Sequence, residues 1–505
     1  MRTALKRNIV QCSGIPLLAF SATVALSVGN AHAQTVTPAK EAPLPAVSTD
    51  LVPLPDELAN VVASGVTADK VGAAAAATSY EAQAALATLE STSARVDQAL
   101  VAFLPRLSAK AAYSRLSDFT PPAFGTGALV ATPAPAGTLN PSPTIAANFS
   151  FPLVLNNYLL QAQLAIPVSD YFLRIAKVYS AATHAEDAAR FDVIAARAKS
   201  STDGKIAYYN WLRARGALYI SFQAQNDVRT HLKDARNALA VGHASMADVL
   251  RAETASANAE LLVERSRSLH EVTEKQVVIA MHLPTDDRLI VGERVDVPPP
   301  PYVGNLKLLV NEAHSQRPEL KSIELNAKAS RANATLLKAG RYPSLIALGE
   351  ATYANPNPRR IPASNDWFPT WAVGAQVTWS PNDVGSANAQ GNEWDARAAT
   401  LDAQKQLVRD GIELEVHHAY NIVREADLAI GTTRRQLVSA TEAHRVAREL
   451  FTHGRATSTT LTDAETDLLR ARLEALNASI EARMARVRLE HAAGRVAKAM
   501  VVTPR

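Results

Sequence analysis

The chain has 505 residues, of which 52 are Lys or Arg and 48 are Asp or Glu. Three of its four net positive charges are Arg2, Lys6 and Arg7, so the remaining sequence is almost neutral and nucleic acid is excluded as a partner. The length suffices for several hydrophobic cores, and abundant Ala with only 21 Gly favours long, closely packed helices over a sheet-rich enzyme.

The N-terminus has the three parts of a secretory signal peptide. The cations named above precede an apolar stretch over 15–28, and the small-x-small sequence Ala-His-Ala follows at 31–33. We predict a signal peptide over 1–33 with Gln34 as the first mature residue; an uncleaved anchor helix is the alternative. Cys12, the only cysteine, would be removed, which leaves no disulfide, thiolate catalysis or cysteine metal site. No later stretch has the length of about 18 apolar residues that a transmembrane helix requires.

The first half of the chain alternates between helical and strand periodicity. We predict a Pro- and Ala-rich leader with the start of the first helix (34–78), then a first structural repeat (79–297) with strands at about 104–116 and 146–167 and a helical hairpin at about 169–283. The hairpin begins with one very long helix or two stacked ones, and Gly204 is a predicted weak point or kink. Gly242 suits the left-handed end of that helix, and Ser245 with Asp248 predicts a capping box at the start of the next.

The second half has the same elements in the same order. We predict a Pro-rich connector (298–304), then a second structural repeat (305–505) with helices broken at Pro318, strands at about 342–354 and 370–381, and a helical hairpin at about 385–499. The two long helices of this hairpin carry apolar stripes, over 408–430 and 469–487, which we predict to face each other.

A constant offset of 212 positions relates the two halves. It joins Gly242 to Gly454, Tyr208 to Tyr420, Ser245 to Thr457 and Glu253 to Glu465. Such self-similarity indicates two copies of one structural unit. Each copy is strand–loop–strand between helices, followed by a long helical hairpin.

The four strands have the length and period of outer-membrane strands, about ten residues that alternate apolar with small or polar. Aromatic side chains lie near their ends, as anchors at a membrane interface do: Tyr113, Tyr158, Tyr353, Trp371 and Trp379. Four strands cannot close a barrel, and an open edge in lipid would leave N–H and C=O groups unpaired at several kcal/mol each. Several chains must therefore share one barrel with closed symmetry. The alternative is two ordinary hairpins in a soluble domain.

The order of elements, the repeat and several segments resemble TolC-like outer-membrane efflux proteins over essentially the whole mature chain. The segments are PRLSAKAAYSRL (105–116), YPSLIALGEATYA (342–354), VG…DVLRAE (241–253) and HGRATSTTLTDAET (453–466). The resemblance implies a mainly α fold with a small transmembrane β part, in which long hairpins form an α-barrel and each chain gives four strands to a trimeric twelve-strand β-barrel.

The resemblance also implies a function. The chain would be the outer-membrane channel subunit of a tripartite efflux or secretion system, a passive duct from periplasm to exterior. It would sit in outer membrane lipid with its helical part in the periplasm, form a homotrimer, and dock to a periplasmic adaptor (membrane fusion) protein and an inner-membrane pump. No cofactor is implied.

Candidate site residues come from the same resemblance. In the family the hairpin tips meet the adaptor, and the matching positions here are Val241, Gly242, Ser245, Asp248, Gly454, Thr457, Thr460 and Leu461. Gly, Ser and Thr are also wanted there simply to end and start helices. Family members carry acidic residues six and nine places after the second-half Gly; here these places hold Thr460 and Asp463, so one carboxylate is missing. Asp463 and Asp467, one turn apart, are the possible periplasmic gate, which would favour cations; otherwise they are solvated helix charges.

Catalytic and metal-binding motifs are absent from the sequence. His417 and His418 are adjacent and point to different helix faces, while His270-Glu271 lacks the second His of a zinc-protease motif. We expect each His to be a surface side chain, no metal or catalytic residue, and no enzyme. The competing hypotheses are a soluble periplasmic coiled-coil scaffold or adaptor, which would not explain the four strands, and a periplasmic enzyme.

Overall fold

The computed structural model describes residues 65–118, 128–130, 144–146, 153–284, 289–295, 297–361 and 363–501. The predicted signal peptide, Cys12, Gln34 and most of the predicted leader lie outside this part of the chain. All described residues belong to one unit, Val52–Arg505.

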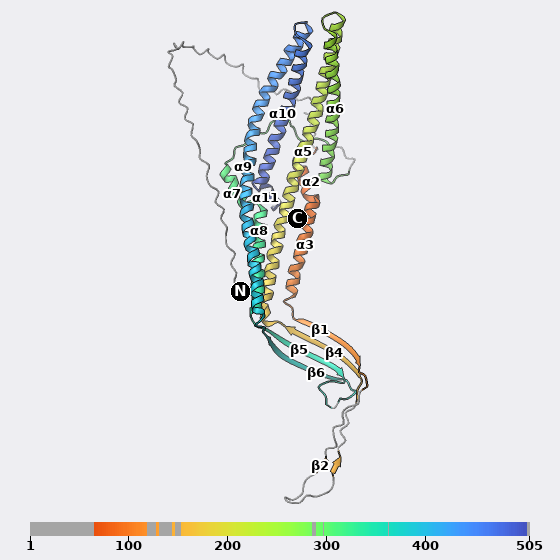
Figure 1. Ribbon diagram of the computed structural model, residues 1–505, viewed down its shortest axis with the longest axis vertical. Coiled ribbons are helices and arrows are strands. Elements are labelled where there is room, and N and C mark those ends of the chain that lie inside the picture. The colour runs from red at the N-terminus through yellow and green to blue at the C-terminus, as the bar shows by residue number, and fades with distance from the viewer. Residues whose placement is uncertain are drawn as a thin grey trace, which may run out of the picture. The chain divides into compact units, whose positions relative to one another are not determined.

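Long helices and one sheet make up this unit (Figure 1). Its helices are α2 (Ala68–Thr78), α3 (Tyr80–Val101), α4 (Val168–Asp170) with a π-helical turn (Tyr171–Ile175), α5 (Ala176–Ala240), α6 (Met246–Met281), α7 (Leu306–Gln316), α8 (Pro318–Lys338) with a 3₁₀ turn (Ala339–Arg341), α9 (Asp383–Thr452), α10 (Ser458–Ala492) and α11 (Arg495–Val501). Its strands are β1 (Arg106–Arg115), β2 (Ala128–Val130), β3 (Thr144–Ala146), β4 (Asn156–Ile166), β5 (Ser344–Asn355) and β6 (Phe368–Thr378). No helix of the described residues has both the length and the apolar character needed to cross a membrane.

The internal repeat is visible in the fold. Helices α2, α3, α5 and α6 of the first half correspond to α7, α8, α9 and α10 of the second. The Tyr208 hydroxyl on α5 donates to the Val66 carbonyl just before α2, at 2.8 Å. Its counterpart Tyr420 on α9 donates to the Gly304 carbonyl just before α7, at 3.2 Å. The 212-residue offset thus joins two tyrosines that make equivalent contacts.

The long helices lie side by side in one layer. On a given side, each of α5 and α9 packs against one shorter helix near the sheet and another near the hairpin tips. Next to the sheet the order is α3, α5, α8, α9, and towards the hairpin tips it is α6, α5, α10, α9 (Figure 1). Helix α9 therefore lies on one flank of the layer, where α7 packs against it at mid-height, and α3 and α6 lie on the other flank. Helix α5 runs as one continuous helix through Gly204, and a Cβ there would lie 2.8 Å from the Ala75 Cβ of α2, so glycine permits a close helix approach.

Helix α10 contributes side chains to two separate hydrophobic clusters, one with α5 and one with α9. The predicted α9 stripe is buried, but the α10 side chains packed against it are small residues and Leu489, together with α7. The predicted α10 stripe, represented by Ile480 and Met484, instead packs against Tyr208 and Trp211 of α5. The prediction that the two stripes face each other is therefore wrong. Because α10 lies between α5 and α9, it needs two apolar faces.

The sheet is antiparallel, in the order β1-β4-β5-β6. A row across all four strands holds Ala109, Ala162, Ala351 and Trp371, and the next row along the sheet on the same face holds Leu107, Leu164, Gly349 and Val373. The row between them, on the opposite face, holds Ser108, Gln163, Glu350 and Ala372. Successive side chains of a strand point to opposite faces, so one face is apolar except at the end farther from the helices, where it holds Arg115, Asn156 and Asn355, and the other face is mostly polar.

Both edges of this sheet are open within the described residues, since β1 pairs only with β4 and β6 only with β5. The apolar side chains at the edges are exposed, among them Leu107 and Val373. Three of the predicted interface aromatics gather at the sheet end farther from the helices. There the rings of Tyr158 and Tyr353 lie 5.8 and 4.9 Å from Trp367, and the Tyr113 ring lies 5.0 Å from Tyr158.

Two details differ from the predicted strands. Strand β4 begins at Asn156, about ten residues later than predicted, although 147–152 lie outside the described residues. The short pair β2 and β3 lies almost entirely between the first two predicted strands, where we predicted a loop.

Candidate functional site

The tips of the two hairpins end their first helices in the same way. Gly242 has φ +79° and Gly454 has φ +67°, the left-handed conformation that glycine adopts without strain. After α5, the His243 N–H donates to the Ala238 carbonyl at 2.8 Å, and after α9 the Arg455 N–H donates to the Leu450 carbonyl at the same distance. These are the bonds of a Schellman motif, so the predicted helix ends are confirmed.

The next helices start with different caps. The Asp248 N–H donates to the Ser245 hydroxyl at 3.2 Å, and the Ser245 N–H donates back to the Asp248 carboxylate at 3.0 Å, which confirms the capping box. The hydrogen bonds from Ser245 lower the pKa of the Asp248 carboxyl. At the second tip the Thr460 N–H donates to the Thr457 hydroxyl at 3.3 Å, and Thr460 has no carboxylate to return the bond.

The predicted tip residues differ in how far their side chains are exposed. Val241 is exposed, as is the neighbouring Met246, so the first tip presents apolar side chains to its surroundings. Leu461 is only 2% exposed and packs inside the layer. Its side chain offers no surface to a partner, and we withdraw it from the predicted contact residues.

The two candidate gate residues are both exposed on α10. Asp467 lies 3.7 Å from the Arg470 guanidinium, which partly balances its charge. Asp463 has no ion pair among the described residues, so it carries the less compensated carboxylate of the two. The neighbouring Leu461 and Leu468 are buried, which fixes the face of α10 on which these carboxylates lie.

A buried polar cluster near the tips was not predicted. His231 of α5 lies between two residues of α10, with Nδ1 3.2 Å from the Glu465 carboxylate and Nε2 3.1 Å from the Ser458 hydroxyl. We call these three residues the His231 cluster. His231 is only 2% exposed, so the prediction of a surface side chain is wrong for this histidine. Ser, His and a carboxylate in this order also occur in hydrolases, but here the Ser458 side chain is buried and closed to a substrate.

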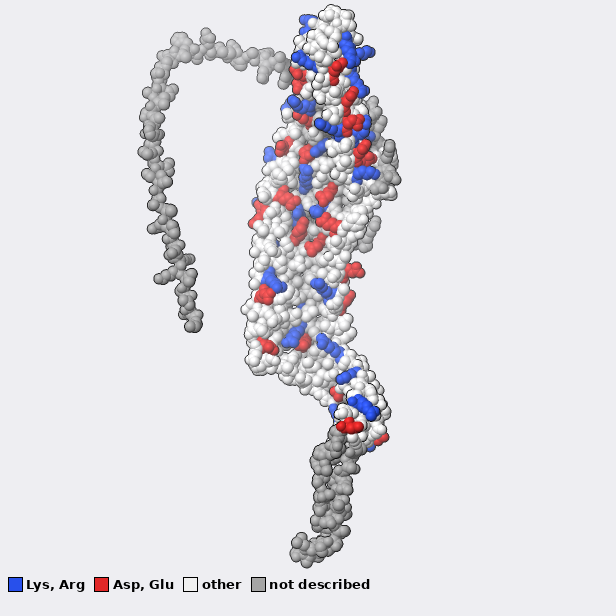
Figure 2. Space-filling model, turned by 45° about the vertical axis from the view of Figure 1, so that its right-hand side comes forward, with Lys and Arg blue, Asp and Glu red and all other residues white. Residues whose placement is uncertain are grey.

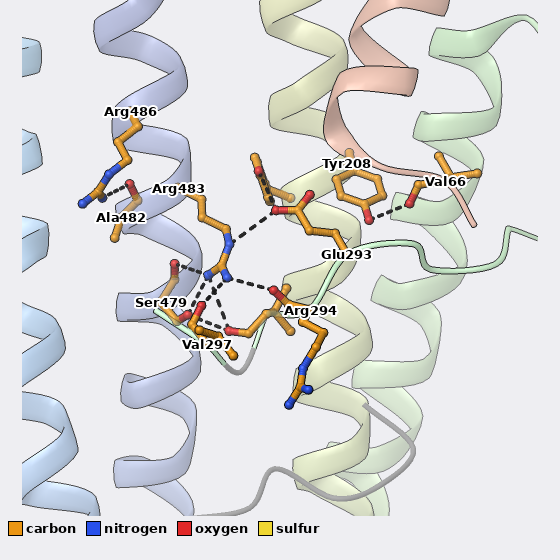
Figure 3. A network of polar contacts seen from close by, with 11 residues as sticks. Val66, Tyr208, Glu293, Arg294, Val297, Ser479, Ala482, Arg483 and Arg486 are labelled. Atoms are coloured by element: carbon orange, nitrogen blue, oxygen red, sulfur yellow. Dashed lines mark hydrogen bonds and ion pairs between the residues drawn. The ribbon is translucent and has the colours of Figure 1, made fainter. Parts of the chain in front are cut away.

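A second network, also not predicted, holds the end of the first half and the connector that follows it against α10 (Figure 3). Arg483, 9% exposed, donates to the carbonyls of Arg294 at 2.8 Å and Val297 at 2.5 Å. Its Nε lies 3.5 Å from the Glu293 carboxylate, which also accepts a bond from the Tyr209 hydroxyl at 3.0 Å.

One turn further along α10, Arg486 extends this network. It donates to the Pro300 carbonyl at 2.6 Å and to Asp427 of α9 at 2.7 Å. Two arginines thus fasten the connector across the middle of the layer. On the face in view in Figure 2, charges of both signs are intermixed along the helices, in keeping with the near-neutral composition.

An antiparallel sheet with one apolar face, joined to paired long helical hairpins, is the architecture of TolC-like channels. Residues 309–495 match the family described as Outer membrane efflux protein. No curated protein matches the chain in sequence.

Solved structures share the fold over most of its length. The chain is similar to the outer-membrane channel OprN (18% identity, TM-score 0.69, covering 86% of this chain and 94% of OprN). It is similar to the outer membrane protein VceC of Vibrio cholerae (16%, 0.68, covering 85% and 96%). A third similar structure is the open state of the MtrE outer membrane channel of Neisseria gonorrhoeae (18%, 0.67, covering 85% and 88%). The predicted resemblance and fold class are confirmed.

Proposed function

We propose that the chain is one subunit of a homotrimeric, non-enzymatic duct that lets solutes pass from the periplasm to the exterior, as part of a tripartite system. The observation that carries this proposal is the open sheet, which has an exposed apolar face, a mostly polar opposite face and two unpaired edges. In lipid an apolar face is favourable, but unpaired edge groups are not. Edges of neighbouring copies would have to pair.

The strand order suits such a closure. Antiparallel strands alternate in direction, so in a four-stranded sheet the edge strands β1 and β6 run in opposite directions. Joining β6 of one copy to β1 of the next therefore continues the antiparallel pattern. A ring built in this way from three copies has twelve strands, more than the about eight whose interior side chains alone can fill. The polar faces would then line a water-filled interior.

The flanks of the helical layer also favour a second copy of the chain as the partner. On α9, Leu414 and Leu428 are exposed, and a Cβ built at the nearby Gly411 and Gly431 would meet nothing within 4 Å. Each mid-helix glycine costs about 0.5–1 kcal/mol relative to alanine, and no contact within the described chain offsets that cost. On the opposite flank, α6 exposes apolar side chains that include Ile279. A neighbouring copy would cover both flanks.

The exposed residues of the hairpin tips indicate where partners would bind at the periplasmic end. We propose that Val241, Gly242, Ser245, Asp248, Gly454, Thr457 and Thr460 contact an adaptor protein, which in turn joins an inner-membrane pump. The exposed Val241 supports this, because an apolar side chain at a helix turn gains from burial against a partner. Asp463 and Asp467 would line the entrance; Asp463→Asn should reduce cation selectivity in planar lipid bilayers, and unchanged selectivity would remove Asp463 from the gate.

A cysteine pair tests the ring. Asp427 of α9 binds Arg486, and Val277 of α6 packs in the same cluster as Met484, so Leu428 and Ile279 lie at similar heights on opposite flanks. A chain with both residues changed to Cys should form disulfide-linked dimers and trimers in outer membranes.

The matched control replaces Ile279→Cys by Leu250→Cys. Leu250 lies 29 residues away on α6, or about 43 Å at about 1.5 Å per residue, and should not cross-link to Leu428→Cys. A water-soluble monomer that forms no cross-links would instead support the periplasmic scaffold.

A further inference from the structure

The two halves of the chain differ at one equivalent position near the tips. Glu253 on α6 accepts a bond from Arg236 of α5 at 2.7 Å, so its exposed ion pair lies within one hairpin. Its counterpart Glu465 on α10 has Arg448 of α9 at the position equivalent to Arg236. Glu465 instead binds His231 of the other hairpin, and its side chain is only 7% exposed. The repeat is therefore broken where a contact within a hairpin becomes a contact between hairpins.

The geometry of this contact fixes the start of α10. Both ring nitrogens of His231 are used, one by Glu465 and one by Ser458, the first residue of α10. The Phe451 ring at the end of α9 packs edge-on against the imidazole, with 5.1 Å between centroids. Three helices thus meet at one side chain. The residue equivalent to His231 in the second half is Ala443, which has no such group.

A cleft beside the His231 cluster leaves fewer apolar contacts between the two hairpins, so the polar contacts of the cluster provide a larger share of the contact between them. The cleft, of about 230 Å³, lies between α5, α6 and α10, with Glu465 on its wall. Apolar packing between the hairpins is therefore incomplete at this height. The other charged groups in the cleft, Asp227 of α5 and Arg472 of α10, pair with each other at 3.3 Å.

We propose that the His231 cluster is a latch that holds the tip of the α9–α10 hairpin against α5 and so limits the opening of the periplasmic entrance. Asp463 precedes Glu465 by two residues on the same helix, so the latch also fixes where the candidate gate carboxylates lie. This inference rests on the proposed function as a duct.

Two measurements on the full-length protein test the latch. In His231→Leu, amide hydrogen exchange over 457–467 should become about tenfold faster, because local opening no longer has to break these bonds. The open probability of single channels in planar bilayers should rise as well. Ser458→Ala removes one bond with minimal change of volume and should give the same changes to a smaller extent; it serves if His231→Leu does not fold.

Glu253→Gln is the matched control, because it removes the equivalent carboxylate at the tip and should leave both measurements as in the wild type. Unchanged exchange over 457–467 in both cluster variants would overturn the latch, as would an equal increase in α8, which indicates general destabilisation. A wild-type protein that never conducts would refute the duct, whereas the exchange measurement would still decide whether the contact holds α10.

Discussion

Replacing Arg483 with Met tests whether the segment that leads into the connector is fastened by one buried guanidinium. Methionine keeps an unbranched apolar side chain, so the change removes chiefly the charge and the donors. The lost bonds include those to the carbonyls of Arg294 and Val297 and to the Ser479 hydroxyl, and the Glu293 carboxylate loses its ion pair. A hydrogen bond to a charged group contributes about 1.5–3 kcal/mol, and removing one partner of a buried ion pair costs about 3–5 kcal/mol.

These contributions do not add, because one side chain makes them all. We therefore expect Arg483→Met to lower the free energy of unfolding by about 3–5 kcal/mol in total. Lysine retains the charge but not the planar fork of donors, so Arg483→Lys should lose roughly half as much. Urea unfolding of the detergent-solubilised protein, followed by circular dichroism at 222 nm, measures both values. Limited proteolysis should also cleave the connector of Arg483→Met faster than that of the wild type.

The control is Arg470→Met on the same helix. Arg470 is exposed and its ion pair with Asp467 is long, at 3.7 Å, so the change should cost less than about 1 kcal/mol. If Arg483→Met were as stable as this control, the connector would be held by other contacts and the argument for Arg483 would fail.

Three further outcomes are expected. Gly204→Ala gains about 1 kcal/mol of helix propensity but places a Cβ 2.8 Å from that of Ala75, and overpacking of about 1–3 kcal/mol should lower the urea midpoint; a raised midpoint would contradict the close helix contact. Val373→Asp on the apolar sheet face should abolish the trimer band in outer membranes, whereas Gln376→Asp on the polar face should not; trimers in both would refute the assignment of faces. Burial lowers the pKa of His491, so the folded state binds fewer protons than the unfolded one, and stability is complete above about pH 6.5 and falls as the pH drops below it. His491→Gln should weaken this decline between pH 7 and 5, measured by urea midpoints, and an identical decline would rule out His491 as a source.

Local signals in the sequence were sufficient for the helix ends at the hairpin tips and for the four long strands, apart from the start of β4. Gly242 and Gly454 are needed where φ is positive, and Ser245 with Asp248 forms the predicted capping box, because each motif depends on residues within one turn. The alternation of the strands predicted their faces, because side chains of a strand point to opposite sides. The 212-residue offset predicted that the halves share one arrangement.

Contacts between distant elements were decided only by the tertiary structure. One stripe on α10 could be read from the sequence, but which neighbour it meets depends on α10 lying between α5 and α9. His231 and Arg483 have no local pattern, since their partners are 227 residues away at Ser458 and 186 residues away at Val297. The sequence held one indication of the His231 contact. Glu465 has an equivalent residue in the first half, Glu253, whereas the residue equivalent to His231 in the second half is Ala443. Buried polar groups take partners wherever the fold places them, and a periodic pattern specifies a face without specifying what covers it.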